Sequence, residues 1–390
     1  MLSQVLSQLR LDVTTVVSSV LGRGPSPFVQ RRPRRAARVA HTPSLGRPLQ
    51  VDEVIRETED TVSLVLSDPA GPLQFTPGQF FTLIVTVGGE RLRRAYSASS
   101  EPGALGGRVR LTVRRQPEGR VSTHLVAHAR AGDTLTALGP SGGFVPAAYA
   151  FPPHVLLVGG GSGITPLLSI ARHLLACEPA KRVTLVFGNR RERDIPFRAE
   201  LLALVAAHPG RLVVRHVLSE PEERWTEGVG MLTRDVLDRE LDGLADALGG
   251  ASADDTAAFL CGPEPMMRAA RAALRGRGLT DDQIREEAFT SPASAGVAPK
   301  GPVELTFRVD GQSVRAVQAV GKTLLEAGLE AGLDLPYSCA MGGCGACKLH
   351  LVSGETTREG LALTPAERRA GLVLACSDRA LGPCTLERPR

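Results

Sequence analysis

The spacing of hydrophobic residues changes along the chain, and each change marks a different kind of predicted domain. In residues 47–150, apolar and polar side chains alternate in short runs between glycine- and proline-containing turns. The clearest runs are residues 61–66, 80–87, 93–98 and 109–114. A two-residue period interrupted by frequent turns is typical of antiparallel strands. We therefore expect an antiparallel β-barrel over residues 47–150.

Residues 151–292 show a different pattern, in which strongly apolar runs alternate with segments whose hydrophobic residues recur every three to four positions. The runs at 154–158 and 183–187 predict buried strands. The helix after the first of them is expected to have Thr165 as its N-cap and Pro166 as its first residue. Alternating strands and helices predict an α/β domain with a parallel sheet.

Residues 303–390 combine both patterns. Two apolar runs flank Asp310-Gly311, which predicts a hairpin, and Thr323 with Glu326 predicts the capping box of a helix. Residues 293–302 are rich in Ala, Gly and Pro and are interpreted as a linker. The chain is thus expected to be multidomain, with a barrel, a parallel-sheet α/β domain and a smaller α+β domain.

The first 46 residues differ from the rest in both hydrophobicity and charge. Residues 2–21 place apolar side chains at helical spacing, which predicts an amphipathic helix, and prolines between 24 and 46 predict a linker. Residues 1–46 contain seven arginines and one aspartate, so the chain's net charge of +5 belongs to this extension. Two interpretations stay open: a helix that packs on this protein or is unfolded, and one that contacts a membrane surface or a partner protein.

The composition excludes several classes of function. Aromatic residues make up 4% of the chain, and its excess positive charge is confined to one end, so we expect no nucleic-acid binding. No apolar run is long enough to span a membrane, and no secretory signal is recognised. We expect a cytoplasmic protein, with peripheral membrane contact through residues 1–46 as the open alternative.

Four of the seven cysteines predict a metal centre. Cys339, Cys344 and Cys347 have the spacing C-x4-C-x2-C, and Cys376 follows after 28 intervening residues. The residues between the first three are mostly Gly and Ala, which lets the backbone curl around inorganic sulfide and direct N–H groups at it. This spacing resembles that of plant-type ferredoxins, which bind a 2Fe-2S cluster. A structural zinc site is the alternative, although such sites usually pair two closely spaced knuckles, and an odd cysteine count argues against a disulfide framework.

Two segments of the predicted barrel suit a phosphate-containing cofactor. Their candidate residues are Arg94, Tyr96 and Ser97 in the first segment and Gly119, Ser122 and Thr123 in the second. Strand alternation places Arg94 and Tyr96 on one face, so that a cation and a stacking ring are presented together. The second segment opens an apparent helix, whose N-terminus is a natural anion site.

The predicted α/β domain has two glycine-containing turns, each directly after a strand. Their candidate cofactor-binding residues are Gly160, Gly161, Gly163 and Thr165 in the first turn and Cys261, Gly262 and Pro263 in the second. Glycines let the backbone approach a diphosphate, and each turn leads into a helix with free N–H groups. Each of these glycine-containing segments, taken alone, is also compatible with a tight turn that binds no ligand. Cys261 alone is also compatible with a buried structural thiol.

Together with residues 77–80, Gly132-Asp133 and Glu287-Ala288-Phe289, these segments resemble the ferredoxin-NADP reductase superfamily. In the barrel, the resemblance implies that Arg94 and Ser122 bind the diphosphate of a flavin. It also implies that Tyr96 packs on the isoalloxazine ring. FAD is favoured over FMN because the segment at Gly119 suits a diphosphate.

The resemblance also implies roles beyond the flavin phosphates. Ser97 is expected near flavin N5 and Cys261 beside the nicotinamide ring, so these two residues are the catalytic candidates. Phe289 is expected to shield the flavin. The order of elements after residue 303 is similar to the β-grasp fold of ferredoxins.

The choice of nucleotide is expected to depend on the segment after the second strand of the α/β domain. Arg190 and Arg191 follow that strand, and no acidic residue stands at its end. Arginines favour the 2′-phosphate of NADPH, whereas an acidic residue would favour the ribose 2′-hydroxyl of NADH. We therefore expect NADPH, with NADH as the alternative.

The domain order is similar to that of reductase components that supply electrons to oxygenases, hydroxylases and desaturases. The resemblance implies an enzyme that passes electrons from NAD(P)H through FAD and a 2Fe-2S cluster, one at a time, to a terminal oxygenase, hydroxylase or desaturase. Two alternatives stay open. One is a stand-alone diaphorase or a reductase of a haem or globin acceptor, and the other is a redox sensor without turnover.

Overall fold

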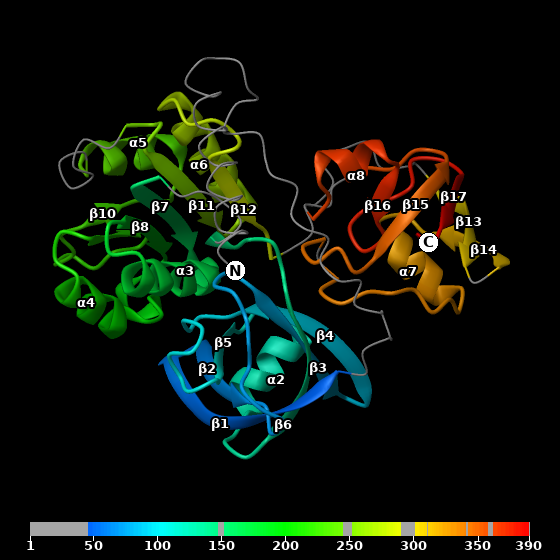
Figure 1. The fold of residues 1–390 in the computed structure, drawn as a ribbon, viewed down its shortest axis with the longest axis horizontal. Helices are drawn as coiled ribbons and strands as arrows, with labels where there is room; N and C mark the ends of the chain where they lie inside the picture. Colours follow the sequence, from blue (N-terminus) through cyan, green and yellow to red (C-terminus); the bar gives the residue numbers. More distant parts are fainter. Residues whose placement is uncertain are drawn as a thin grey trace, which may run out of the picture. The chain divides into compact units, whose positions relative to one another are not determined.

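The structure is a computed structural model. It describes residues 46–146, 152–244, 252–289, 301–309, 311–340, 342–357 and 362–389. The predicted helix at 2–21, the proline-rich segment that follows it and most of the linker at 293–302 lie outside the described residues. Within the described residues, the strands form three sheets of six, six and five strands (Figure 1).

The first sheet is an antiparallel barrel. Its strands are β1 (Arg47–Thr58), β2 (Thr61–Ser67), β3 (Phe80–Val87), β4 (Glu90–Ser97), β5 (Val109–Arg114) and β6 (Thr134–Ser141). They pair in the order β4-β3-β6-β1-β2-β5, and a bridge between Ala98 and Leu111 brings the two edge strands together. Helix α2 (Arg120–His128) lies against the barrel strands (Figure 1), and its Val121 and Leu125 belong to the barrel core. The predicted antiparallel barrel is confirmed.

The second sheet is parallel throughout. Its strands are β7 (His154–Gly160), β8 (Arg182–Asn189), β9 (Leu212–Leu218), β10 (Gly228–Val229), β11 (Thr256–Cys261) and β12 (Ile284–Glu287). Their order is β10-β9-β8-β7-β11-β12. The predicted parallel sheet is therefore confirmed.

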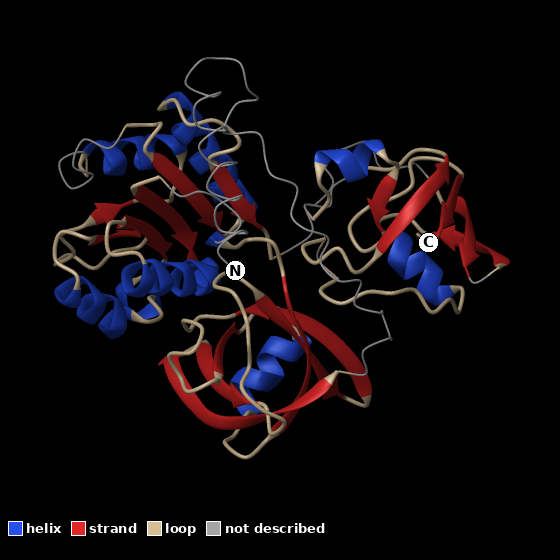
Figure 2. Cartoon of the chain, in the orientation of Figure 1, coloured by secondary structure: helices blue, strands red, loops and turns tan. Residues whose placement is uncertain are grey.

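Helices cover both faces of this parallel sheet (Figure 2). They are α3 (Ile164–Cys177), α4 (Arg198–Ala207), α5 (Arg234–Asp242) and α6 (Glu264–Gly276), with short 3-10 turns η2 (Gly161–Gly163) and η3 (Glu192–Asp194). Successive strand residues serve opposite faces: Leu157 packs in the core that contains α3, and Leu156 in the core that contains α6. This double burial explains the continuous apolar runs in the sequence.

The start of α3 differs from the prediction. Gly163, not Thr165, is the N-cap residue, because the 3-10 turn η2 runs directly into the helix and starts it earlier. Thr165 lies inside the first turn, where its hydroxyl donates to the carbonyl oxygen of Ser162 at 3.0 Å. Pro166 still falls within the first turn, where its missing N–H has no intrahelical partner to lose.

The third sheet is small and mixed. It contains β13 (Val303–Val309), β14 (Gln312–Gln318), β15 (Lys348–Ser353), β16 (Leu372–Leu374) and β17 (Cys384–Glu387), in the order β14-β13-β17-β15-β16. Its helices are α7 (Leu324–Glu330) and α8 (Pro365–Arg369). The capping box predicted for α7 is confirmed, with Thr323 and Glu326 bonded reciprocally. Leu324 and Leu325 of α7 join the core of this α+β domain.

Candidate functional site

One cavity of about 1020 Å³ is lined by residues of both the barrel and the α/β domain. It contains most of the predicted flavin and nicotinamide residues. The barrel contributes Arg94, Tyr96, Ser97, Gly119, Ser122 and Thr123, and the α/β domain contributes Gly160, Gly161, Thr165, Gly262, Pro263 and Phe289. Segments that looked weak one by one in the sequence thus line a single site.

Gly163 and Cys261 do not line the cavity but explain how its two glycine turns fit together. Cys261 is fully buried, and a Cβ atom at Gly163 would lie only 2.0 Å from its carbonyl oxygen. A Cβ atom at Gly160 would lie 2.9 Å from Cδ of Pro263. The two turns therefore pack closely against each other, and at both glycine positions the tertiary contact leaves no room for a side chain.

The second barrel segment forms the N-terminus of α2, with Gly119 as the N-cap residue. The hydroxyl of Ser122 accepts from the backbone N–H of Gln116 at 3.1 Å and donates to the carbonyl oxygen of Gly119 at 3.2 Å. Its side chain therefore stabilises the turn. The N–H groups of the first helical turn face no helical acceptor and remain suited to an anion.

Arg94 and Tyr96 occupy the same strand, β4. Burial raises the pKa of Tyr96 above its usual value, against the opposing effect of the Arg94 charge, so the phenol is neutral across the physiological range. An uncharged ring beside a guanidinium is suited to a flavin, which has both an aromatic ring system and a diphosphate.

Three strands bring Ser97, Cys261 and Glu287 together beside the cavity. Ser97 Oγ donates to Glu287 Oε2 at 3.1 Å, and Cys261 pairs with Glu287 in the β11–β12 register. Burial raises the pKa of Glu287 to about 8, opposed by the Ser97 hydrogen bond and reinforced by the negative charge of Cys339. Burial and Glu287 also raise the pKa of the Cys261 thiol. A neutral acid, a hydroxyl and a thiol are thus held together at neutral pH.

Glu287 was noticed in the sequence only as part of a terminal motif, and its contact with Ser97 could not be inferred there. The two residues are 190 positions apart. Only the juxtaposition of β4 and β12 makes Glu287 a candidate for holding or moving a proton at the Ser97 hydroxyl.

Arg114 and Asp60 are cavity-lining residues that the sequence analysis missed. Arg114 Nε donates to Asp60 Oδ2 at 2.8 Å, and a Cβ atom at Gly161 would lie 2.7 Å from Arg114 Nη1. Burial by itself would raise the pKa of Asp60, but hydrogen bonds from Arg114, Thr58 and Thr61 hold it below its usual value. The ion pair fixes a guanidinium of the barrel against the first glycine turn.

Arg190 and Arg191 lie outside the cavity, where both contact one carboxylate. Arg190 Nε donates to Glu220 Oε1 at 2.7 Å, and Arg191 Nη2 donates to Glu220 Oε2 at 2.6 Å. Glu220 follows β9, the neighbour of β8 in the sheet. Asn189, at the end of β8, is buried, and both its amide atoms lack a partner among the residues that the structure describes. An acidic residue, absent from the end of β8, is thus present in the segment that follows the adjacent strand β9.

The four predicted cluster cysteines converge at the third sheet. Cys347 Sγ lies 3.2 Å from Cys376 Sγ, and Cys339 interacts with both Cys344 and Cys376. Backbone N–H groups point at these sulfurs, including Gly342 N to Cys376 Sγ at 3.1 Å. Four converging thiols with surrounding N–H donors fit a 2Fe-2S cluster, whose potential such hydrogen bonds tune.

Residues next to the first cluster cysteine contact the barrel. Arg93 Nη1 donates to the carbonyl oxygen of Tyr337 at 2.7 Å, and its guanidinium lies 4.2 Å from the centre of the Tyr337 ring. Ser338 Oγ donates to Thr82 Oγ1 at 3.2 Å. The strand that presents Arg94 and Tyr96 to the cavity therefore presents Arg93 to the cluster loop.

Three parts of the chain match known protein families. Residues 48–145 match the oxidoreductase FAD-binding domain, residues 157–272 the oxidoreductase NAD-binding domain, and residues 307–380 the 2Fe-2S iron-sulfur cluster binding domain. The cofactors are therefore FAD, a nicotinamide nucleotide and a 2Fe-2S cluster. Among the described residues, no helix is both long and apolar enough to cross a membrane.

Two relatives resemble almost the whole chain. The ferredoxin reductase component of 3-ketosteroid-9-alpha-monooxygenase from Mycolicibacterium smegmatis is 37% identical over 349 residues, which cover 84% of this chain and 92% of the relative. A component of the 1,2-phenylacetyl-CoA epoxidase from Escherichia coli is 35% identical over 345 residues, covering 84% and 93%. The solved structure of phthalate dioxygenase reductase shares the fold, with a TM-score of 0.60, 23% identity and coverage of 88% of this chain and 98% of that one.

Proposed function

Because the chain belongs to the family of NAD(P)H-dependent oxidoreductases that combine FAD-binding, NAD-binding and 2Fe-2S domains, we propose that it supplies single electrons to a terminal oxygenase, hydroxylase or desaturase. The observation that supports this most is the single cavity lined by both cofactor motifs, in a chain that also gathers four cluster thiols. The similar relatives are named as components of a monooxygenase and an epoxidase.

The division of labour follows from the chemistry of the groups. When bound, flavin accepts two electrons as hydride from NAD(P)H and releases them singly, and the cluster carries one electron at a time. We assign the diphosphate to Arg94 and the α2 N-terminus, and the isoalloxazine face to Tyr96 and Phe289. The glycine turn from Gly160 and the Gly262-Pro263 turn would hold the nicotinamide nucleotide.

We assign proton handling to Ser97 and Glu287. Ser97 lines the cavity, and Glu287 lies behind it at hydrogen-bond distance. Because burial raises the pKa of Glu287 to about 8, this carboxyl holds its proton at neutral pH and can share it with the Ser97 hydroxyl. Cys261, buried next to Glu287, would pack below the nicotinamide without carrying charge.

We propose that NADPH is the preferred donor, with Glu220 setting the strength of that preference. Arg190 and Arg191 together provide two cations for a 2′-phosphate. Glu220 accepts hydrogen bonds from both, so the phosphate must compete with a carboxylate for them. Glu220 thereby holds the two arginines in place before the nucleotide binds, and it lowers their affinity for the 2′-phosphate.

Residues 1–46 are proposed to contact a membrane surface or a membrane-bound partner of a protein that otherwise works in the cytoplasm. The support is the amphipathic pattern of residues 2–21 and the arginines that follow it. Basic residues beside an apolar helical face favour anionic lipid surfaces.

An acceptor screen with the purified holoprotein tests the proposed function. We expect about one flavin and two irons per chain, rapid NADPH oxidation with ferricyanide, and product formation when a cognate iron oxygenase and its substrate are added. Reduction of a haem protein or globin in preference to any iron oxygenase would favour the stand-alone reductase. If NADPH reduces the protein once and no acceptor supports turnover, the result would favour a redox sensor.

A further inference from the structure

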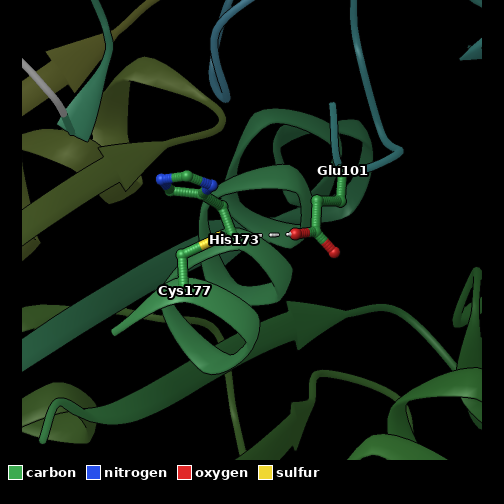
Figure 3. Close-up of side chains that lie close together, drawn as sticks. All are labelled: Glu101, His173 and Cys177. Carbon is green, nitrogen blue, oxygen red and sulfur yellow. Dashed lines mark hydrogen bonds between the residues drawn. The ribbon is translucent and has the colours of Figure 1, made fainter. Parts of the chain in front are cut away.

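A cluster of three potential metal ligands lies apart from the redox cavity. Glu101, His173 and Cys177 each offer one ligand atom, and these atoms lie within 4.8 Å of one another. Figure 3 shows the three side chains close together, with Cys177 Sγ 3.9 Å from Glu101 Oε1. None of the three lines the flavin cavity or belongs to the cluster loop.

The backbone, and not only side-chain rotation, brings these groups together. His173 and Cys177 are four residues apart in α3, so they lie on one face of the helix. Ser169 is one turn earlier on the same face, and its buried hydroxyl donates to the carbonyl oxygen of Ser100 at 2.7 Å. This hydrogen bond holds the chain next to Glu101 along the stripe of α3 that carries the other two ligands.

We propose that Glu101, His173 and Cys177 bind one zinc ion, with water as the fourth ligand. Imidazole nitrogen, thiolate sulfur and carboxylate oxygen are the three donor types that zinc accepts, and mixed donors do not suit calcium or magnesium. Tetrahedral zinc places its ligand atoms roughly 3.3 to 3.8 Å apart, given its bond lengths. The separation of 3.9 Å between Cys177 Sγ and Glu101 Oε1 lies just above that range, and the remaining separations, all within 4.8 Å, must shorten by at most about 1 to 1.5 Å to reach it.

The surroundings leave room for the ion. Cys177 is exposed, so solvent can reach the fourth position. The nearby guanidinium of Arg172 is paired with Glu200 of α4, which reduces its repulsion of a cation. Because Glu101 follows the barrel strand β4 and the other ligands belong to α3, bound zinc would link the barrel to the α/β domain.

The part of the chain that the structure describes has two other places where zinc could bind, and the test must distinguish them from the proposed site. One is the set of cluster cysteines, which hold iron in the holoprotein. The other is His124 and His128 on α2, whose ring centres are 5.1 Å apart. Among the described residues, that pair has no third ligand, so it serves as a matched control.

The experiment measures zinc and iron in holoprotein dialysed against a buffer of fixed free Zn²⁺ concentration. We expect one zinc per chain with the two irons retained. Cys177→Ser, His173→Gln and Glu101→Gln should each weaken zinc binding by more than about 100-fold, since even the loss of a supporting outer contact costs 10- to 100-fold. The double variant His124→Ala/His128→Ala should bind zinc like the wild type.

Alkylation of Cys177 in the wild-type holoprotein gives a second measurement that no variant's folding can disturb. Iodoacetamide should modify this exposed thiol, and Zn²⁺ should protect it, as read by mass spectrometry of the peptide. Absence of protection would overturn the proposal. So would an absence of bound zinc, zinc that displaces iron, or zinc that is lost with the α2 histidines and retained in the three ligand variants.

Discussion

Three of the four cluster cysteines come from nine consecutive residues, whereas the walls of the flavin cavity come from positions as far apart as Asp60 and Phe289. The cluster loop makes its own shape: Ala340, Gly342 and Gly345 all have positive φ, between 55° and 77°. The cavity has no such local origin. Its glycine turn is shaped partly by Cys261 and Pro263, which belong to another turn.

Sequence signals are strongest for a site whose ligands come from one segment. A site whose ligands are close in sequence must encode its spacing locally, so four cysteines suffice to predict it. A site assembled from distant strands takes its residues from many short segments. Each of these segments, read alone, is also compatible with a structural role. Loss of one cysteine should therefore abolish cluster binding, whereas loss of one cavity residue should only reduce cofactor binding or turnover.

The largest effect is expected from removing the cluster. Ending the chain at residue 290, or replacing Cys376→Ser, should reduce electron delivery to the partner oxygenase by orders of magnitude, because the one-electron outlet is lost. Ferricyanide reduction should persist at a substantial fraction of the full rate, because the cavity is retained. Cys384→Ser is the control, since this cysteine of the same domain bonds to backbone carbonyls and not to the cluster thiols. A truncated protein that serves the oxygenase as well as the intact one would assign the outlet to the flavin.

The next effect is expected at Ser97. Ser97→Ala should slow flavin reduction by NADPH about 100-fold, if the hydroxyl takes part in proton handling, and flavin content should be unchanged. Stopped-flow absorbance of the flavin measures this. Ser99→Ala removes a neighbouring hydroxyl that bonds inside the barrel, to the Arg110 carbonyl and Thr112, and should leave the rate intact. Equal slowing by both variants would point to barrel packing rather than chemistry.

Glu287 allows the cavity to be tested by pH. Its folded pKa is about 8 and its ordinary value is 4.5, so the folded protein keeps a proton that the unfolded chain releases between these values. The free energy of unfolding should therefore fall as pH rises from 5 to 8. Glu287→Gln should remove this dependence, and the two proteins should diverge by at most a few kcal/mol at pH 8. Urea denaturation of both proteins at pH 5 and pH 8 measures this difference. If the free energy of unfolding changed equally with pH in the two proteins, Glu287 would not be a buried neutral acid.

A smaller effect is expected for nucleotide choice. Arg190→Ala with Arg191→Ala should raise the KM for NADPH about tenfold through the loss of charge-assisted contacts, with little change for NADH. Glu220→Gln should lower the KM for NADPH, because the arginines are released to the phosphate. Arg193→Ala, an exposed arginine in the same segment, is the control. Equal changes with both nucleotides would remove the basis for the NADPH proposal.

The smallest effect on catalysis is expected from the N-terminal extension. Deleting residues 1–46 should abolish sedimentation with anionic vesicles or a membrane-bound partner and leave NADPH oxidation with soluble dyes unchanged. Sedimentation that does not change would favour a helix that packs on this protein or is unfolded. A loss of dye reduction would mean that the extension supports the cavity itself.

The sequence alone was enough to predict the antiparallel barrel, the parallel sheet, the four cysteines proposed as cluster ligands and about half of the cavity lining. Periodicity identifies a strand with one or two buried faces, and local spacing identifies ligands that one loop presents. Even the capping box at Thr323 and Glu326 was predictable, because both partners lie within one helical turn.

The residues that lie across from each motif depend on tertiary contacts. Thr165 was predicted as an N-cap, but the packing of the η2 turn moved the helix start to Ile164. Glu287 behind Ser97, Glu220 between two arginines and Glu101 beside α3 are all acids whose partners lie on segments distant in sequence. The spacing of hydrophobic residues does not indicate such pairs. An acidic residue at a strand end or in a loop has the same local sequence pattern whether it faces water or a distant side chain.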